Sequence, residues 1–340
     1  MNTSIQLDTT NRWSAYALRA VSAVVVLAAL AVPVGAGIRW WPSDVGRRVT
    51  TPAAVLSGEQ LQSYAEFADS RPNPAPLVIS YHDIAPEGSS DSKYAVSPEA
   101  LEEHMAMLEA AGFESISSQQ MVDYLDGRAI PARSVLITFD DGARGIWRYA
   151  DRILERHGFH ATAFIITGSV GTRQPYYVTW SELRRMRDSG RWDFGGHTDD
   201  GHRFVAGGPA EQDSGPFLLT REWLADDGRL ETLDEWRGRV AADLDANVAR
   251  LAEEGFEAPL LFVHPYAAVI SPTNDPAIPM ELDRLVEERF AASVANNQQY
   301  AGTVGPTQIA ERHLLRIAVR GITTTDDLFQ RLRDVSDSAP

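Results

Sequence analysis

The 340-residue sequence contains no cysteine. Disulfide bonds, thiolate metal sites and a cysteine nucleophile are therefore excluded. Any metal ion would have to be held by histidine, aspartate or glutamate, a donor set that favours a hard or borderline divalent ion. The sequence also lacks a GxGxxG motif after an expected strand and a GxxxxGK[ST] motif, so dinucleotide and phosphate-loop sites have no support.

Positive charge is scarce. Lys and Arg number 31 against 47 Asp and Glu, which gives a formal net charge of -16. A polyanion such as nucleic acid is a poor partner for that surface, so we expect no nucleic-acid binding. A neutral polymer, or one that becomes cationic during a reaction, is compatible with it. The charge does not indicate an oligomeric state.

One long apolar run, Ala20–Ile38, lies near the N-terminus and is followed by Trp40 and Trp41. At about 19 residues the run can just span a bilayer as a helix, and tryptophans suit a membrane–water interface. We therefore expect residues 1–19 to be a cytoplasmic N-terminus and residues 20–41 to be a transmembrane anchor. A cleaved signal peptide is the alternative, and it would give a secreted protein. Both interpretations put the rest of the chain outside the cytoplasm.

Residues 42–76 form an expected linker, with one short helix around Ser57–Ala68. From residue 77 to residue 335, β-rich runs alternate with amphipathic stretches. Strands are expected at Leu77–Tyr81, Ser134–Phe139, Ala161–Thr167, Trp192–Gly195, Leu260–Val263 and Leu314–Val319. Helices are expected at Ser97–Ala111, Ile146–His157, Thr179–Asp188, Thr232–Glu254, Met280–Arg289 and Thr324–Val335. This alternation predicts an α/β fold with a parallel sheet, for which a barrel is the natural closure. Val205–Glu231 is expected to be an insertion between two units.

Polar residues follow four of the expected strands. They are Tyr81-His82-Asp83, Asp140-Asp141-Gly142, His197 to His202, and His264-Pro265-Tyr266. In a barrel of parallel strands the C-terminal ends meet at one face, where active sites are built. A single histidine or an Asp-Asp-Gly turn is most often structural. Four such segments on one face instead indicate a functional site.

His197 and His202 are five residues apart. On a helix they would lie roughly 140° apart and could not share a metal ion. Gly195, Gly196 and Gly201 favour a loop, on which both imidazoles can reach one ion. Two histidines and one aspartate make a facial site with open positions, and an adjacent carboxylate could take a proton from water.

At these residues the sequence resembles a polysaccharide deacetylase with a NodB-homology domain, of carbohydrate esterase family four. The resemblance covers about residues 77–335. It rests on ISYHDI (79–84), TFDDG (138–142), GGHTDDGH (195–202), VHPYA (263–267) and LLRIAV (314–319), which occur in the family's order. The opening ISYHDI is most similar to the branch that deacetylates biofilm poly-N-acetylglucosamine.

The resemblance implies a distorted (β/α) barrel of about seven units, preceded here by the transmembrane or signal segment. It also implies one divalent metal ion of the zinc, nickel, cobalt or iron group. By position, Asp141, His197 and His202 would be the metal ligands. Asp140 would be the general base and His82 the general acid.

The resemblance further implies that the region of Pro265 and Tyr266 supplies a backbone N–H to the oxyanion. Tyr81, Tyr266 and Trp180 are expected to help line a sugar-binding groove. His264 stands where the family has an arginine. His264 and His313 are expected to be surrounding residues or alternative acids.

The predicted function is removal of N-acetyl groups from an N-acetylglucosamine-type polysaccharide at the cell surface. The expected partners are an acetylated amino-sugar polymer and, through the N-terminal segment, a membrane. A peptidoglycan deacetylase is one alternative. A non-catalytic glycan-binding surface protein is another, although the three candidate ligands and the base are all present.

Overall fold

The structure is a computed structural model, which describes residues 47–70, 75–266, 272–296 and 304–337. The expected N-terminal segments, 1–19 and 20–41, lie outside these residues. Among the residues that are described, no helix combines the length and the apolar character needed to cross a membrane.

Parallel strands close into a ring in the described part of the chain. Its seven members are β1 (Leu77–Tyr81), β3 (Ser134–Phe139), β4 (Ala161–Ile165), β5 (Trp192–Gly196), β10 (Leu261–Val263), β11 (Ala292–Asn296) and β12 (His313–Ala318). The hydrogen-bonded order is β1-β12-β11-β10-β5-β4-β3, and β3 pairs with β1 to complete the ring. The short strand β2 (Glu114–Ser115) also pairs with β3. The predicted α/β barrel of about seven units is confirmed.

The barrel is filled by apolar side chains. Val78, Leu136, Phe164, Val263 and Leu314 come from five strands and belong to one buried cluster. Side chains from strands around a ring can meet in one cluster only in its interior. Neighbouring residues of β1 and β3 belong to a second buried cluster, together with residues of the surrounding helices. This alternation is the period of two that a strand imposes.

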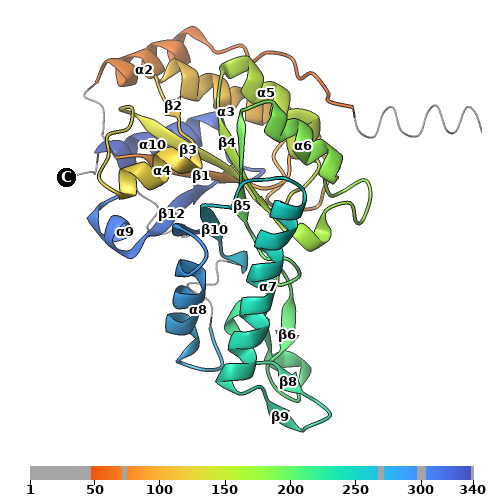
Figure 1. The fold of residues 1–340 in the computed structure, drawn as a ribbon. Helices are drawn as coiled ribbons and strands as arrows, with labels where there is room; N and C mark the ends of the chain where they lie inside the picture. Colours follow the sequence, from red (N-terminus) through yellow and green to blue (C-terminus); the bar gives the residue numbers. More distant parts are fainter. Residues whose placement is uncertain (1–46, 71–74, 267–271, 297–303, 338–340) are drawn as a thin grey trace, which may run out of the picture. The chain divides into compact units, whose positions relative to one another are not determined.

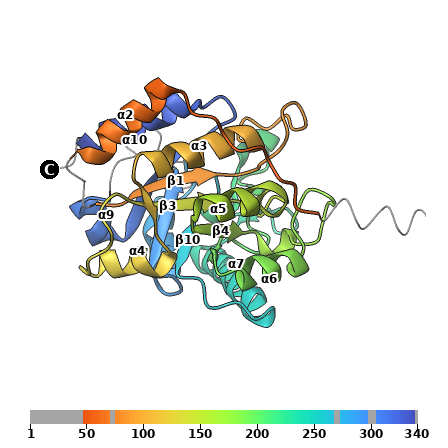
Figure 2. The same cartoon turned by 90° about the horizontal axis from the view of Figure 1, so that it is seen from above.

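Helices surround the strands, as the view from above shows (Figure 2). They are α2 (Gly58–Asp69), α3 (Pro98–Ala110), α4 (Ser118–Leu125), α5 (Asp151–His157), α6 (Trp180–Asp188), α7 (Leu233–Glu253), α8 (Ile278–Glu287), α9 (Pro306–Glu311) and α10 (Thr325–Asp337). A π-helical turn, Ile146–Ala150, leads into α5. Capping boxes form at the starts of α6 and α7, where Thr179 pairs with Glu182 and Thr232 with Glu235.

The segment expected to be a linker is part of the folded unit from Arg48 onward. The predicted short helix is present as α2, but it is not isolated. Its Tyr64 is 1% exposed and packs edge-on against Phe329 of α10, at 4.6 Å between ring centroids. Its Phe67 stacks on Phe113 at 5.8 Å. Apolar burial therefore joins this segment to the barrel.

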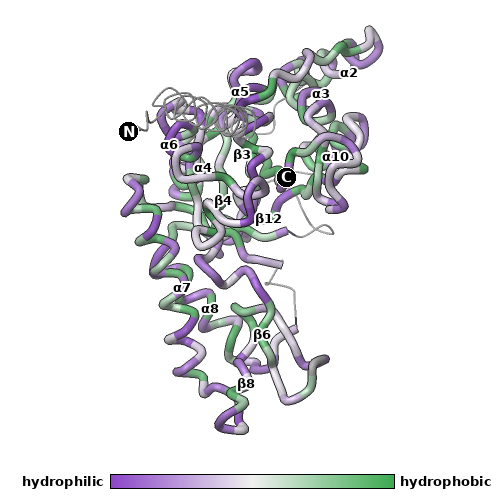
Figure 3. The backbone as a smooth tube through the Cα atoms, turned by 90° about the vertical axis from the view of Figure 1, so that its right-hand side faces the viewer, coloured by the Kyte–Doolittle hydropathy of each residue, from purple (hydrophilic) through white to green (hydrophobic). Residues whose placement is uncertain are grey.

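The predicted insertion forms two small hairpins. One is β6 (Phe204–Ala206) with β7 (Ser214–Pro216), and the other is β8 (Trp223–Leu224) with β9 (Arg229–Leu230). Together with α7 and α8 they extend beyond the end of the strands, and we call this part the arm (Figure 1). Hydrophobic and hydrophilic residues alternate along α7 (Figure 3). Its apolar side chains, which include Trp236 and Val240, join Phe217 and residues of α8 in a third buried cluster.

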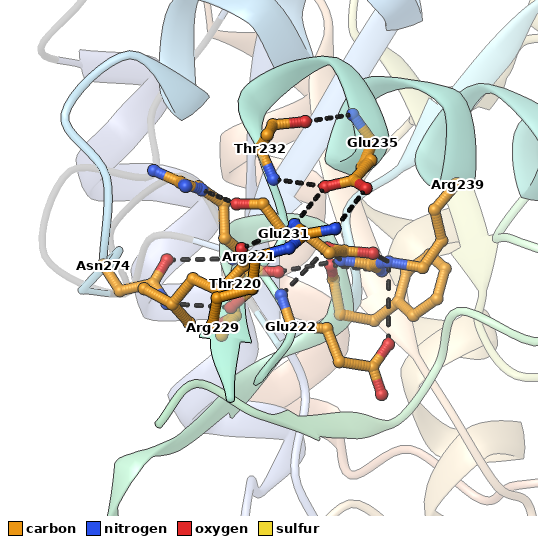
Figure 4. A network of polar contacts seen from close by, with 11 residues as sticks. Thr220, Arg221, Glu222, Arg229, Glu231, Thr232, Glu235, Arg239 and Asn274 are labelled. Carbon is orange, nitrogen blue, oxygen red and sulfur yellow. Dashed lines mark hydrogen bonds and ion pairs between the residues drawn. The ribbon is translucent and has the colours of Figure 1, made fainter. Parts of the chain in front are cut away.

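A polar network stabilises the arm (Figure 4). The Glu231 carboxylate accepts hydrogen bonds from Arg239 at 2.8 Å and from the backbone N–H of Glu222 at 2.9 Å. The Asn274 side chain bonds both the N–H and the carbonyl of Arg221, each at 2.9 Å. These bonds tie the β8–β9 hairpin to α7 and to the segment before α8.

The first prediction concerns His104 of α3, which is fully buried beside Tyr81, with 3.2 Å between its Nδ1 and the Tyr81 Oη. Burial lowers its pKa to about 4. In the unfolded chain the imidazole of His104 is protonated below about pH 6.5, whereas in the folded protein it stays neutral down to about pH 4. The stability of the fold with His104 neutral is therefore fully present above about pH 6.5, and protonation of the unfolded chain reduces it as the pH falls toward 4. His104→Gln should therefore lose less stability in acid, by up to about 3 kcal/mol. Urea unfolding at pH 7.5 and pH 4.5 measures the difference, and equal losses for both proteins would contradict the assignment.

Candidate metal centre and active site

Residues from four strand ends meet at the C-terminal face of the barrel. His82 follows β1, Asp140 and Asp141 follow β3, the loop from His197 to His202 follows β5, and His264 follows β10. Because all the strands run parallel, these ends lie on the same side of the ring. The arm begins two residues after His202, at this same face.

Asp141, His197 and His202 form a group that could hold a metal ion, and their ligand atoms lie within 4.8 Å of one another. The Asp141 Oδ1 is 3.2 Å from the Nε2 of His197 and 3.4 Å from the Nε2 of His202. These are the three residues predicted from the sequence.

The hydrogen bonding of His197 supports a ligand role. Its Nδ1 lies 2.8 Å from the carbonyl oxygen of Val263, so Nδ1–H donates there and Nε2 faces the Asp141 Oδ1, where a metal ion bound between them would take the Nε2 lone pair. Burial, and then the nearby His197, lowers the pKa of His202 to about 4, which leaves that imidazole neutral at neutral pH. One carboxylate oxygen and two imidazole nitrogens make a donor set that suits zinc, nickel, cobalt or iron.

Asp140 is not a member of this group and is held by Arg316 of β12. The Arg316 Nη1 donates to the Asp140 Oδ1 at 2.8 Å, and its Nη2 donates to the Oδ2. The Arg316 side chain is 1% exposed and that of Asp140 is 2% exposed. A bidentate pair in this environment fixes the orientation of the carboxylate.

The same pair controls the charge of Asp140. Burial would raise the pKa of this carboxyl, but Arg316 and then His82 oppose it, and the pKa lies below its ordinary value. Arg316 is itself held by Thr138 at 3.0 Å and by Asn296 at 2.8 Å. Asp140 is therefore a carboxylate at neutral pH.

His82 lies beside Asp140, with 3.5 Å between its Nε2 and the Asp140 Oδ2. Its ring stacks on Tyr94 at 4.5 Å between centroids. Burial lowers the pKa of His82, although Asp140 and Asp141 partly offset the effect. The predicted acid therefore lies next to the predicted base, and in this environment its neutral form is favoured.

The loop that carries His197 and His202 is anchored by α7. The Asp243 carboxylate accepts the backbone N–H of Asp199 at 3.1 Å and that of Asp200 at 2.7 Å. One helical turn further along, Asn247 donates to the carbonyl of Thr198 at 2.7 Å. Thr198 is fully buried with a φ of 70°, an unusual conformation for threonine that the surrounding hydrogen bonds maintain.

Steric restriction allows only glycine at position 201 of this loop. A Cβ added there would lie 2.9 Å from the Phe217 ring and 3.0 Å from the Asp243 carboxylate. The arm and the anchor therefore both pass too close for a side chain, which explains why glycine precedes the second histidine.

Two residues expected in a sugar-binding groove are elsewhere. Tyr81 is 0% exposed and its hydroxyl meets His104 inside the core. Trp180 packs against the buried cluster between barrel and helices. The prediction that Tyr81 lines a groove is wrong, because the alternation of β1 turns its ring inward. Trp180 is half-buried, and its ring packs against Phe256 at 6.2 Å between centroids.

The two histidines offered as alternative acids differ in position. His264 is 3% exposed, and burial, followed by His313 and His197, lowers its pKa to about 3. Its ring lies 5.9 Å from that of His313, whereas the His82 imidazole lies against the Asp140 carboxylate. His313 starts β12, at the opposite end of that strand from the site, and its Nδ1 lies 2.7 Å from the Ser293 hydroxyl.

Pro265 is buried, whereas Tyr266 is 41% exposed beside the candidate ligands. The Tyr266 ring lies 4.5 Å from the His202 ring, and its hydroxyl donates to the His202 carbonyl at 3.0 Å. Tyr266 has a φ of 56°, so the backbone turns sharply at this point. Of the three expected groove residues, Tyr266 alone borders the site.

Sequence reasoning missed three residues that position this site: Arg316, Asp243 and Asn247. The signal for Arg316 was present as a lone charge inside the apolar run LLRIAV. Asp243 and Asn247 are four residues apart in a long amphipathic helix, where polar residues are ordinary. Their contacts with the ligand loop depend on how α7 packs against it.

Comparisons with known proteins find similarity to polysaccharide deacetylases. Residues 127–278 match the family model for polysaccharide deacetylase. A poly-beta-1,6-N-acetyl-D-glucosamine N-deacetylase from Escherichia coli K12 is 25% identical over 204 residues, which cover 56% of this chain and 30% of that protein. A protein of the same name from Staphylococcus epidermidis is 28% identical over 146 residues, or 38% of this chain and 50% of that one. The match thus spans half or less of each relative.

Solved structures share the fold. A de-N-acetylase from Aggregatibacter actinomycetemcomitans has a TM-score of 0.63 at 21% identity, covering 75% of this chain and 98% of that one. IcaB from Ammonifex degensii has a TM-score of 0.59 at 23% identity, covering 76% of this chain and 97% of that one.

The second prediction concerns the anchor on α7. Asp243→Asn keeps the shape of the side chain, but its amide nitrogen would face a backbone N–H of the loop. The ligand loop should loosen, and we expect about tenfold weaker metal binding. Competition with a chromogenic chelator measures the affinity.

Asp245→Asn is the matched control. Asp245 is on the same helix, but its carboxylate is 64% exposed and pairs with Arg289. It should bind metal as the wild type does. Equal affinities for all three proteins would show that Asp243 does not support the ligands.

Proposed function

We propose that this chain, which carries a polysaccharide deacetylase domain, hydrolyses the N-acetyl groups of a poly-N-acetylglucosamine polymer and depends on a divalent metal ion. The observation that carries the proposal is the convergence of Asp141, His197 and His202 beside a carboxylate that Arg316 holds ionised. A base and three metal-ligating side chains in one place are what metal-assisted amide hydrolysis requires.

In this proposal Asp141, His197 and His202 hold the metal ion. When bound, the ion supplies Lewis-acid polarisation of the acetyl carbonyl. The tautomer of His197 supports this role because Val263 occupies its Nδ1–H. The α7 anchor keeps the two histidines in register with Asp141.

The proton transfers fall to Asp140 and His82. Asp140 takes a proton from the attacking water as the water oxygen bonds to the carbonyl carbon. The proton then passes from Asp140 to His82, whose Nε2 lies 3.5 Å from the Asp140 Oδ2. As the carbon–nitrogen bond breaks, protonated His82 gives that proton to the departing nitrogen, which leaves acetate and a free amine. The backbone N–H at Tyr266 is proposed to donate to the oxyanion.

The names of the relatives suggest the polymer, because two of them are poly-beta-1,6-N-acetyl-D-glucosamine N-deacetylases. We further propose that the barrel acts outside the cytoplasm, held at the membrane by residues 20–41 or released after cleavage. The acidic surface is compatible with a neutral polymer whose product is cationic.

The direct test of function is incubation of the full chain with oligosaccharides of beta-1,6-linked N-acetylglucosamine, with mass spectrometry to count the acetyl groups lost. The proposal expects acetyl loss that stops after chelation and returns when zinc, nickel or cobalt is added. Activity that persists in a metal-free protein would refute it. Activity on peptidoglycan fragments but not on these oligosaccharides would refute the choice of polymer.

The third prediction separates base from ligand. Asp140→Asn should bind metal as the wild type does, because Asp141 provides the carboxylate ligand. The rate should fall by about 10²-fold or more, since the amide cannot take a proton. Loss of the metal together with the activity would show instead that Asp140 is a ligand.

The fourth prediction identifies the acid. His82→Ala should also keep the metal, and it should slow hydrolysis of N-acetyl substrates much more than that of activated acetyl esters. The amine leaves only when it is protonated, whereas an activated alcohol leaves as an anion. Rates with both substrate classes provide the comparison. An equal decrease for ester and amide would mean that His82 is not the proton donor.

A further inference from the structure

Two exposed aromatic rings adjoin the candidate metal centre. Tyr266 packs over His202, and on its far side the ring of Phe204 meets it edge-on at 4.9 Å between centroids. His202, Tyr266 and Phe204 therefore form a continuous row of rings that starts at a candidate ligand and runs onto the arm. We call Tyr266 and Phe204 the aromatic platform.

The exposure of Phe204 is unusual for its position. It is 53% exposed, whereas the next residue along β6, Val205, is 3% exposed and belongs to the core of the arm. Alternation along a strand explains why one of the two residues faces outward. It does not explain why that residue is a phenylalanine, because a polar side chain would serve stability equally well at this position. An exposed ring next to a site favours a binding role.

The platform is held in place from behind. The arm starts two residues after His202, and Phe204 pairs with Pro216 in the β6–β7 hairpin. The guanidinium of Arg203 lies over the Phe217 ring at 4.8 Å. Phe217 is buried in the arm core, and Arg239, which the network in Figure 4 orients, lies on it at 4.2 Å. A binding surface fixed in this way loses little conformational entropy when a ligand docks.

The surroundings of the platform suit a sugar. The Tyr266 hydroxyl donates a hydrogen bond to the His202 carbonyl at 3.0 Å, which holds this ring beside the candidate metal centre. A sugar that stacks on Phe204 would therefore lie beside an oriented aromatic ring and a hydroxyl oxygen that can accept a hydrogen bond.

We propose that the aromatic platform binds the pyranose ring next to the residue that is being deacetylated. The C–H groups on one face of a pyranose ring carry partial positive charge, and they complement the negative face of an aromatic ring. The platform continues directly from a candidate metal ligand, so a polymer whose acetyl group reaches the site has its neighbouring sugar beside Phe204. This inference rests on the proposed function and adds a recognition site outside the reacting groups.

A two-variant test distinguishes stacking from simple packing. Phe204→Leu keeps an apolar side chain of similar size but removes the ring, and Phe204→Tyr keeps the ring. Each full-length protein is assayed with a pentasaccharide of beta-1,6-linked N-acetylglucosamine and with a small aryl acetate. We expect Phe204→Leu to raise the KM for the pentasaccharide about fivefold at unchanged kcat. Phe204→Tyr should stay within about twofold of the wild type, and the aryl acetate should show no change for either variant.

Met280→Leu is the control, because Met280 is an exposed apolar residue of the arm, on α8, with 64% exposure. It should leave every constant unchanged. Thermal unfolding of each variant identifies any loss of folding. If Phe204→Leu is unstable, Phe204→Tyr still tests the platform. A KM raised about fivefold in a stable Phe204→Tyr variant would contradict stacking.

The outcomes separate the two proposals. A wild type that deacetylates the pentasaccharide, with the same KM in Phe204→Leu, overturns the platform and leaves the proposed function standing. A wild type that cleaves the aryl acetate but no glycan contradicts the proposed function and the platform together. An equal change for the pentasaccharide and the aryl acetate would mean that Phe204 supports the metal centre and does not bind a sugar.

Discussion

The buried ion pair between Arg316 and Asp140 is the interaction on which the arrangement of the site depends. Arg316 comes from β12 and Asp140 follows β3, with β1 between these strands in the ring. Neither charge would be stable in this interior alone, and removing one partner from a buried pair typically costs about 3–5 kcal/mol. The pair can form only if the barrel closes with β12, β1 and β3 in register. The orientation of Asp140, the proposed base, therefore depends on closure of the barrel.

The same constraint explains how two adjacent aspartates can have different roles. Asp141 has a φ of 69°, a left-handed conformation that aspartate tolerates better than most residues. That turn sends the Asp140 carboxylate toward Arg316 and the Asp141 carboxylate toward His197 and His202. The left-handed conformation of Asp141 and the buried pair of Arg316 with Asp140 together orient the two carboxylates of the candidate active site.

Much of this was accessible from the sequence. The alternation of β-rich runs with amphipathic stretches predicted most of the strands and helices, because local hydrogen bonding and amphipathic burial act within a few residues. The convergence of His82, Asp140, Asp141, His197 and His202 followed from the rule that parallel strands end on one face. The sequence did not predict β11, α4 or the two hairpins of the arm, because their hydrophobic patterns are short. It also failed for Tyr81, since nothing in a five-residue apolar strand tells which face will meet a helix.

The positioning residues were beyond sequence reasoning for a further reason. Asp243 holds a loop that lies more than forty positions earlier in the chain. Its carboxylate oxygens are 3.1 Å and 2.7 Å from the backbone nitrogens of Asp199 and Asp200. Such long-range contacts depend on how α7 packs, and the helix itself carries several other acidic residues. His264 stands where the family has an arginine, and only the fold shows that Arg316, on another strand, holds Asp140.

The most direct test of this account is anomalous diffraction from crystals of the full chain grown with zinc or cobalt. The account predicts one strong peak bonded to Asp141, His197 and His202, with both Asp140 oxygens still paired with Arg316. A peak bonded to Asp140, or one bonded to His264 and His313, would contradict the division of roles between the two aspartates.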